Sequence, residues 1–116
     1  MKDFSPSEKA FFILGSLAYE LIHHRGKTEL KKDLEDLDKN RNDINEFIGL
    51  VPTIKAHIYK IEELDKYFPI VAKLLVSERW IEEKDPLDLY FAFVLGYMPI
   101  VDIQYVFPEL FEEFEV

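Results

Sequence analysis

Hydrophobic residues recur at helical spacing along most of this chain. The first such stretch follows Ser5, which can cap a helix N-terminus, with Pro6 in the first helical position and Glu8 completing a capping box. Its apolar positions are Phe11, Leu14, Leu17, Ala18, Leu21 and Ile22, and Phe12 and Ile13 widen the stripe. We therefore predict a helix over about residues 6–25 that is buried on more than one side and ends before Gly26.

The middle of the chain predicts two further helices of different length. The short one covers about residues 29–38, and its narrow apolar seam consists of Leu30, Leu34 and Leu37. The longer one begins with a second capping box, Asp43 with Glu46, and its seam consists of Ile44, Phe47, Val51, Ile54, Ile58 and Ile61. Because Gly49 and Pro52 interrupt that seam, we expect a kink or a break near Val51.

Prolines also mark the next two segments. Pro69 lies within an apolar segment over about residues 62–80, so it either kinks that helix or belongs to the first turn of a new one. Asp85 and Pro86 supply an N-cap and a first helical position for the almost wholly apolar residues 87–98. The start signal and the length favour a helix there over a buried strand.

The remaining residues complete the predicted fold. After Pro99, residues 100–107 fit either a helix or extended chain, and residues 109–114 fit a final acidic turn. Together these elements predict an all-α fold, a compact bundle of about five to six helices, in a single domain over residues 1–116.

Two segments far apart in the chain repeat one short pattern. Ala10–Gly15 reads AFFILG and Phe91–Gly96 reads FAFVLG, each soon after a proline at a predicted helix start. A duplicated unit would need a period that recurs elsewhere, and none does. We therefore expect two core helices that cross closely, with Gly15 and Gly96 letting the backbones approach.

Charge is distributed unevenly along the chain. All 14 basic residues fall within residues 1–84 together with 16 acidic ones, whereas residues 85–116 hold seven acidic residues and no Lys or Arg. The net charge of −9 at pH 7 argues against autonomous nucleic-acid binding, because free binders gain affinity by neutralising phosphates. We expect any contact with nucleic acid to occur within a complex that supplies most of the positive charge.

Six basic residues are candidates for that contact. They are Arg25, Lys27, Lys31, Lys32, Lys39 and Arg41. A helix and its flanking loop could present them to a phosphate backbone independently of nucleotide sequence. The same cluster also fits a solvated helix end, since Glu29–Lys32 and Glu35–Lys39 have the spacing of intrahelical ion pairs. Both interpretations stay open.

The C-terminal segment, within residues 99–116, alternates aromatic and acidic side chains. Its candidate docking residues are Tyr105, Phe107, Glu109, Phe111, Glu112, Glu113 and Phe114. They fit an acidic docking tail for a basic, grooved partner, in which aromatic rings supply contact area and acids supply register. They fit equally well a tail that folds back on its own core.

Residue types needed for catalysis or metal binding are sparse. The chain has no cysteine, and His23, His24 and His57 lack the spacing of a zinc or catalytic metal site. Its four isolated glycines form no phosphate-binding loop. We therefore expect no enzyme activity, no metal or other cofactor and no small-molecule substrate.

No segment has the features of membrane targeting. The N-terminus lacks the apolar core of a secretory signal, and no apolar run approaches the roughly 18 residues that a membrane span needs. We expect a cytoplasmic protein without a membrane contact.

Two motifs carry a family resemblance. Ser7–Leu17, which reads SEKAFFILGSL, and Leu89–Tyr97, which reads LYFAFVLGY, frame a charged middle. This arrangement resembles the α-helical small subunit of CRISPR Cascade-type effector complexes of class 1, type I. It is similar in particular to the small-subunit-like C-terminal domain of type I large subunits.

The resemblance implies a non-enzymatic subunit that stacks with copies of itself and with other effector subunits in a crRNA-guided antiviral complex. Such a subunit braces the assembly and helps to stabilise the target or displaced DNA strand of the R-loop. The charge pattern also fits an alternative, an acidic inhibitor that mimics nucleic acid or a regulatory protein–protein adaptor.

Overall fold

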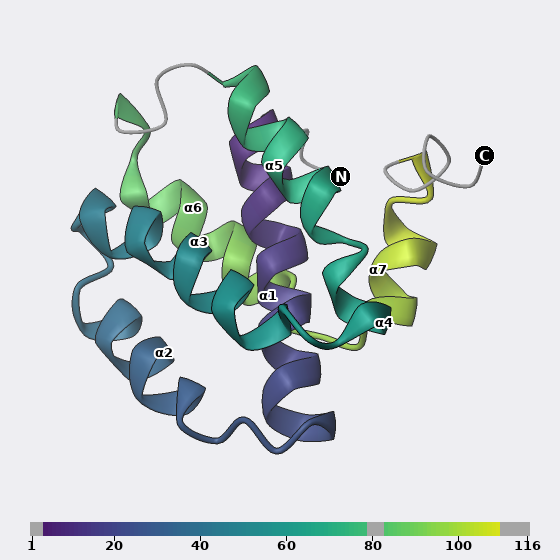
Figure 1. Cartoon of the computed structure of the whole chain (residues 1–116). Coiled ribbons are helices and arrows are strands. Elements are labelled where there is room, and N and C mark those ends of the chain that lie inside the picture. The colour runs from purple at the N-terminus through teal and green to yellow at the C-terminus, as the bar shows by residue number, and fades with distance from the viewer. Residues whose placement is uncertain (1–3, 79–82, 110–116) are drawn as a thin grey trace.

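The computed structural model describes residues 4–78 and 83–109, and this part of the chain is helical, without a strand (Figure 1). Its seven helical segments are α1 (Pro6–His24), α2 (Leu30–Lys39), α3 (Ile44–Ile58), α4 (Glu62–Asp65), α5 (Phe68–Ser77), α6 (Pro86–Leu95) and α7 (Ile100–Val106). The segment α4 is a single turn, and the other helices surround α1. The predicted all-α bundle is confirmed.

Helix α1 is the central element of the bundle and packs against α2, α3, α5, α6 and α7. It starts as predicted, because Ser5 Oγ accepts a hydrogen bond from the Glu8 amide while Glu8 Oε1 accepts one from the Ser5 amide. Nearly every side chain from Ser7 to Ile22 is buried, including Phe12 and Ile13. The prediction that this helix is covered on more than one side is confirmed.

The two glycines of the repeated motif meet where α1 crosses α6. A Cβ atom at Gly15 would overlap the carbonyl oxygen of Phe93, and one at Gly96 would overlap the carbonyl oxygen of Phe12. Each glycine therefore lies directly against the backbone of the other helix, at a distance that any side chain would prevent. The predicted close crossing is confirmed.

Helix α3 runs through Pro52 without a break, so of the kink or break that we expected near Val51, the break does not occur. Proline removes the hydrogen bond to the carbonyl four residues earlier, here that of Ile48. Pro52 lies on the exposed side of the helix, where water can satisfy that carbonyl. The buried side chains of Phe47 and Ile54 flank this position and hold the helix on the core.

Pro69 belongs to the first turn of a new helix, α5, which is one of the two alternatives that the sequence left open. The single turn α4 lies between α3 and α5, and Lys55 fixes it to α3. The Lys55 ammonium donates to Asp65 Oδ1 at 2.6 Å and lies 4.8 Å from the centre of the Phe68 ring. The predicted end of this segment, at Trp80, lies outside the described residues.

An ion pair joins the ends of the connection between α5 and α6. Lys84 Nζ lies 3.1 Å from Glu78 Oε2, and the Glu78 side chain is only 16% exposed. Burial alone would raise the pKa of Glu78, but hydrogen bonds from Lys84, Ser5 and Ser7, together with the Lys84 charge, outweigh burial and hold this pKa below its ordinary value. The carboxylate thus ties this connection to the N-terminal end of α1.

Within residues 4–78 and 83–109, no single helix is long and apolar enough to cross a membrane. Helices α6 and α7 reach the necessary length and composition only as a pair, and they are bent by 111° at their junction.

Candidate interaction surfaces

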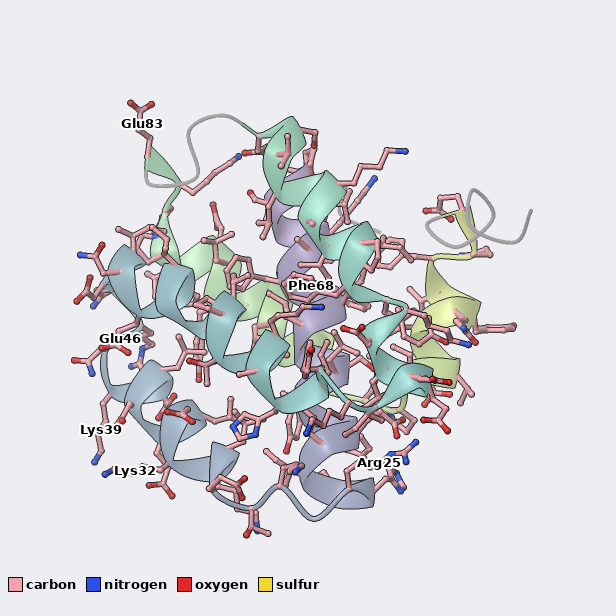
Figure 2. The ribbon with its side chains drawn as sticks, viewed as in Figure 1. Arg25, Lys32, Lys39, Glu46, Phe68 and Glu83 are labelled. Atoms are coloured by element: carbon pink, nitrogen blue, oxygen red, sulfur yellow. The ribbon has the colours of Figure 1, made fainter. Side chains whose placement is uncertain are left out.

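The six basic candidates do not form one patch. Lys31, Lys32 and Lys39 are exposed on α2, whereas Arg25 follows α1. Figure 2 shows Lys32 and Lys39 on one side of the molecule and Arg25 well away from them. One nucleic-acid backbone can therefore contact the three α2 lysines together more readily than all six basic candidates.

Acidic neighbours neutralise two of the six. Arg25 Nη2 lies 3.5 Å from Glu63 Oε2 of α4, and Arg41 Nη1 lies 3.5 Å from Asp38 Oδ1. Within the described part of the chain, the lysines Lys27, Lys31, Lys32 and Lys39 have no ion pair. The free positive charge of this region therefore belongs to lysines, mainly those of α2.

The C-terminal docking candidates separate into exposed and buried residues. Tyr105 is 88% exposed on α7, and Glu109 is also exposed. Phe107 is 6% exposed and packs edge-on against Phe12 of α1, with ring centroids 5.0 Å apart. The assignment of Phe107 to a docking surface is therefore corrected, because this ring belongs to the core. The candidates Phe111, Glu112, Glu113 and Phe114 lie outside the described residues.

A polar face of α1 holds the turn between α6 and α7, which sequence reasoning missed. Ser16 Oγ donates to the Met98 carbonyl at 2.6 Å, Glu20 Oε1 accepts from the Ile100 amide at 3.0 Å, and His23 Nε2 lies 3.1 Å from the Tyr97 hydroxyl. Ser16, Glu20 and His23 fall four and three residues apart, so they share one helix face. That spacing of polar residues within an apolar helix was the signal that could have revealed the contact.

Helices α2 and α6 enclose an apolar groove of about 200 Å³. Its lining residues are Leu34, Leu37 and Asp38 from α2 and Tyr90, Phe93, Val94 and Tyr97 from α6 and the turn that follows. Leu37 and Phe93 belong to the core, and Leu34 and Tyr97 are half-buried, so most of this lining is apolar. Such a groove can accept an apolar side chain of another molecule.

One end of the groove is fixed by a polar cluster. The Tyr90 hydroxyl donates a hydrogen bond to the Asp38 carboxylate, and the Arg41 guanidinium lies 6.0 Å from the centre of the Tyr90 ring. The hydrogen bond to Asp38 raises the pKa of the Tyr90 hydroxyl, and burial and the Asp38 charge add to it against the opposing effect of Arg41. The same hydrogen bond holds the Tyr90 ring where it lines the groove.

The outer face of α6 is an exposed apolar stripe. Phe91 is 60% exposed, Val94 48% and Leu95 55%, at helical spacing along one side of the helix. The opposite side, formed by Leu89, Ala92 and Phe93, is buried. Sequence reasoning treated the whole helix as core, since a segment that is apolar all round carries no periodicity to separate the two sides.

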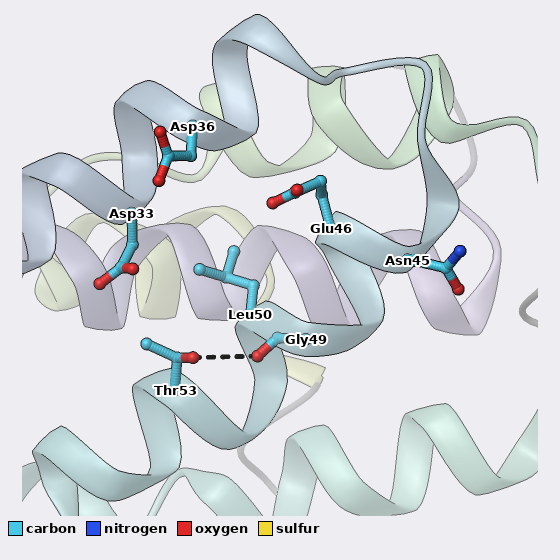
Figure 3. A pocket seen from close by; sticks show the side chains of 7 residues that line it. All are labelled: Asp33, Asp36, Asn45, Glu46, Gly49, Leu50 and Thr53. Carbon is cyan, nitrogen blue, oxygen red and sulfur yellow. Dashed lines mark hydrogen bonds between the residues drawn. The ribbon is translucent and has the colours of Figure 1, made fainter.

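A second concave site, between α2 and α3, has the opposite character (Figure 3). This cleft of about 250 Å³ is lined by Asp33, Asp36, Asn45, Glu46, Gly49, Leu50 and Thr53. Figure 3 shows the three carboxylates spread around the opening, with the Thr53 hydroxyl bonded to the Gly49 carbonyl below. The cleft can attract a cationic group of another molecule.

Two of the three histidines, His23 and His24, are adjacent at the end of α1, whereas His57 lies on α3. His23 contacts Tyr97 and the Tyr19 ring, and His57 Nδ1 lies 3.7 Å from Glu29 Oε1. Over the described ranges, no group of three or more His, Asp or Glu side chains is arranged to hold a metal ion.

Comparison of the chain with protein-family models, curated proteins and solved structures finds no match. The family expected from the two motifs therefore stays a proposal, which the geometry of the chain must support by itself.

Proposed function

We propose that this chain is a non-enzymatic, cytoplasmic subunit of a crRNA-guided antiviral complex of Cascade type. It braces the assembly through protein–protein contacts with other effector subunits and copies of itself, and it helps to stabilise the target or displaced DNA strand of the R-loop. The proposal joins the family resemblance to the surfaces described above.

One observation carries the proposal: helix α6 packs against the core with one side and exposes an apolar stripe on the other. One side of α6 packs on α1 through the glycine crossing, and the other exposes Phe91, Val94 and Leu95. Contiguous exposed apolar surface is typical of sites where proteins meet. Both motifs that carry the resemblance thus contribute to one element pair whose outer side is available for a partner.

The α2 lysines support a modest contribution to nucleic-acid contact. Lys32 and Lys39 lie seven residues apart on one face of the helix and have no acidic partner among the described residues. Glu35 and Asp36 lie between them in the sequence, so the local field is mixed. We therefore expect weak binding by the isolated chain and a contact that matters only within the complex.

Purification from the native host tests the proposal. A tagged chain at its own expression level should retain CRISPR RNA, identified by sequencing, together with effector subunits identified by mass spectrometry. A tagged variant with Phe91→Glu and Val94→Glu, both at exposed positions, is the control for contacts made by α6. Recovery of the wild-type chain without CRISPR RNA or effector subunits would contradict the proposal.

The acidic cleft favours a second candidate, an acidic inhibitor or adaptor that covers a basic protein surface. Asp33, Asp36 and Glu46 around one opening provide the charge pattern that such a protein needs. In the same purification this candidate predicts one basic protein partner and no guide RNA. Loss of that partner after Asp33→Asn and Asp36→Asn would assign the contact to the cleft.

A further inference from the structure

The stripe and the groove of α6 form one continuous surface. Val94 belongs to both, since it is 48% exposed on the helix and also lines the groove. Phe91 lies one turn before it in the sequence and Leu95 follows it directly, while Leu34 lines the groove from α2. A partner that covers the stripe can therefore place a side chain between α2 and α6 in the same contact.

The size and shape of this surface favour a protein helix as the occupant. The groove, at about 200 Å³, falls below the range of roughly 300–1,000 Å³ that is usual for small-molecule pockets. A row of apolar side chains at helical spacing beside a groove is the arrangement in which two helices interlock, ridges of one in the grooves of the other. An apolar side chain of a partner helix fits the groove, and its neighbours cover Phe91 and Leu95.

The charged residues beside the stripe and the groove indicate which kind of partner helix they favour. On the α2 side both signs of charge are present, since Lys31 and Glu35 are both exposed on that helix and Arg41 pairs with Asp38. On the α6 side the charges are negative only, because residues 85–109 contain acids such as Asp88 but no Lys or Arg. A partner helix that carries Lys or Arg along the flank facing α6 is therefore favoured over an acidic one.

The same charges disfavour a second copy of this chain as the occupant. Two copies meeting through α6 would bring two purely acidic segments together, each on a chain of net charge −9. Like charges at an interface oppose association unless a partner compensates them.

We propose that the outer face of α6 and its groove with α2 bind an amphipathic helix with a basic flank from another protein. This inference rests on the proposed function only in treating the chain as a component of an assembly. It moves the main docking surface from the C-terminal aromatic segment to α6.

Binding of synthetic helices to the full-length chain tests the proposal directly. Two fluorescent peptides share one leucine stripe at helical spacing, and one carries Lys on its flank where the other carries Glu. Fluorescence anisotropy should show saturable binding of the Lys peptide, at least about tenfold tighter than that of the Glu peptide at low salt. The difference should shrink as salt is raised from about 50 to about 300 mM.

Variants locate the surface. Phe91→Ala should weaken binding of the Lys peptide by about tenfold, whereas Tyr105→Ala, which removes an exposed ring from α7, should leave it within about twofold. Asp88→Lys should improve binding of the Glu peptide and so narrow the preference for the Lys peptide. A variant that had merely unfolded would not bind the Glu peptide more tightly. Circular dichroism confirms that each variant is folded.

Three outcomes of the peptide assay would overturn the inference. They are the absence of saturable binding by either peptide, equal binding of both peptides at low salt, and loss of binding with Tyr105→Ala but not with Phe91→Ala. A concentration-dependent dimer that Phe91→Ala abolishes would assign the surface to a second copy instead. The peptide assay contains no guide RNA, so its failure and the failure of the Cascade proposal are separate results.

Discussion

Gly15 and Gly96 set the distance between α1 and α6, and with it the position of every other contact between the two motifs. Each lies where a Cβ atom would overlap a carbonyl oxygen of the facing helix. Helical propensity favours alanine over glycine by about 1 kcal/mol at such positions. Overlap with the rigid backbone of the facing helix opposes that gain. Because the two backbones approach so closely, the overlap is the larger effect.

We predict that Gly15→Ala lowers the free energy of unfolding by about 2 kcal/mol or more, because the added methyl group must push α1 and α6 apart. The matched control is Gly49→Ala in α3, where a Cβ atom meets nothing within 4 Å. That control should raise stability by about 0.5–1 kcal/mol. Urea unfolding followed by circular dichroism measures both, and equal effects of the two substitutions would contradict the close crossing.

Single side chains also fix the turn after α6. Ser16 is fully buried, and its hydroxyl donates to the Met98 carbonyl. Ser16→Ala should therefore cost about 1–3 kcal/mol, because it leaves a carbonyl without its donor. Ser77→Ala, which removes an exposed hydroxyl bonded to Leu74, should change stability by less than about 0.5 kcal/mol. Faster exchange of the Tyr97, Met98 and Ile100 amides in the Ser16 variant alone would support the assigned role, and unchanged exchange would argue against it.

At the scale of elements, the helix starts could be predicted where the sequence carries a capping residue or a proline. The capping box at Ser5 and the N-cap at Asp85 marked the starts of α1 and α6, which lie within a residue of the predicted positions. The break that we considered at Pro52 does not occur, because a local rule for prolines in helices does not include the packing that holds α3 on the core. The separation of α4 from α5 stayed open in the sequence, because the bond from Lys55 to Asp65 that holds α4 depends on the tertiary position of both helices.

The Glu78 carboxylate in the connection between α5 and α6 should make the free energy of unfolding fall at acidic pH. The pKa of Glu78 is lower in the folded chain than its ordinary value, so its contribution is complete above the ordinary glutamate pKa of about 4.3 and is lost as pH falls through the lower folded value. Glu78→Gln should reduce stability at neutral pH. It should also flatten the acid limb, which is the decrease in stability as pH falls. The control Glu83→Gln, at an exposed neighbouring position, should leave the limb unchanged. Urea unfolding across pH 3–7 measures the difference, and parallel acid limbs in wild type and Glu78→Gln would refute it.

At the scale of the whole molecule, the sequence predicted the fold better than the surfaces. Periodicity and caps are local, so they identified the helices, and the paired glycine motifs identified one tertiary contact. The outer stripe of α6 escaped because a helix apolar on every side gives no sign of which side the core leaves uncovered. Phe107 was misassigned because only the folded chain shows that its ring reaches Phe12.

The uneven charge has a consequence at this scale. With −9 overall and the free lysines concentrated on α2, the isolated chain should bind nucleic acid weakly. Lys31→Glu, Lys32→Glu and Lys39→Glu together should reduce target-DNA binding by the proposed complex, while Lys60→Glu and Lys66→Glu, at other exposed sites, should not. Filter binding at fixed salt measures the effect, and unchanged binding by the triple variant would remove α2 from the nucleic-acid surface.

The most direct test of the account is side-chain footprinting of the chain alone and in its purified native assembly. Phe91, Tyr59 and Tyr105 are 60%, 67% and 88% exposed, so hydroxyl radicals should oxidise all three in the isolated chain. We predict that the assembly protects Phe91, together with Leu95, while Tyr59, which follows α3, stays reactive as the internal standard. Equal reactivity of Phe91 in the free and assembled chain would contradict the claim that α6 is the surface through which this protein acts.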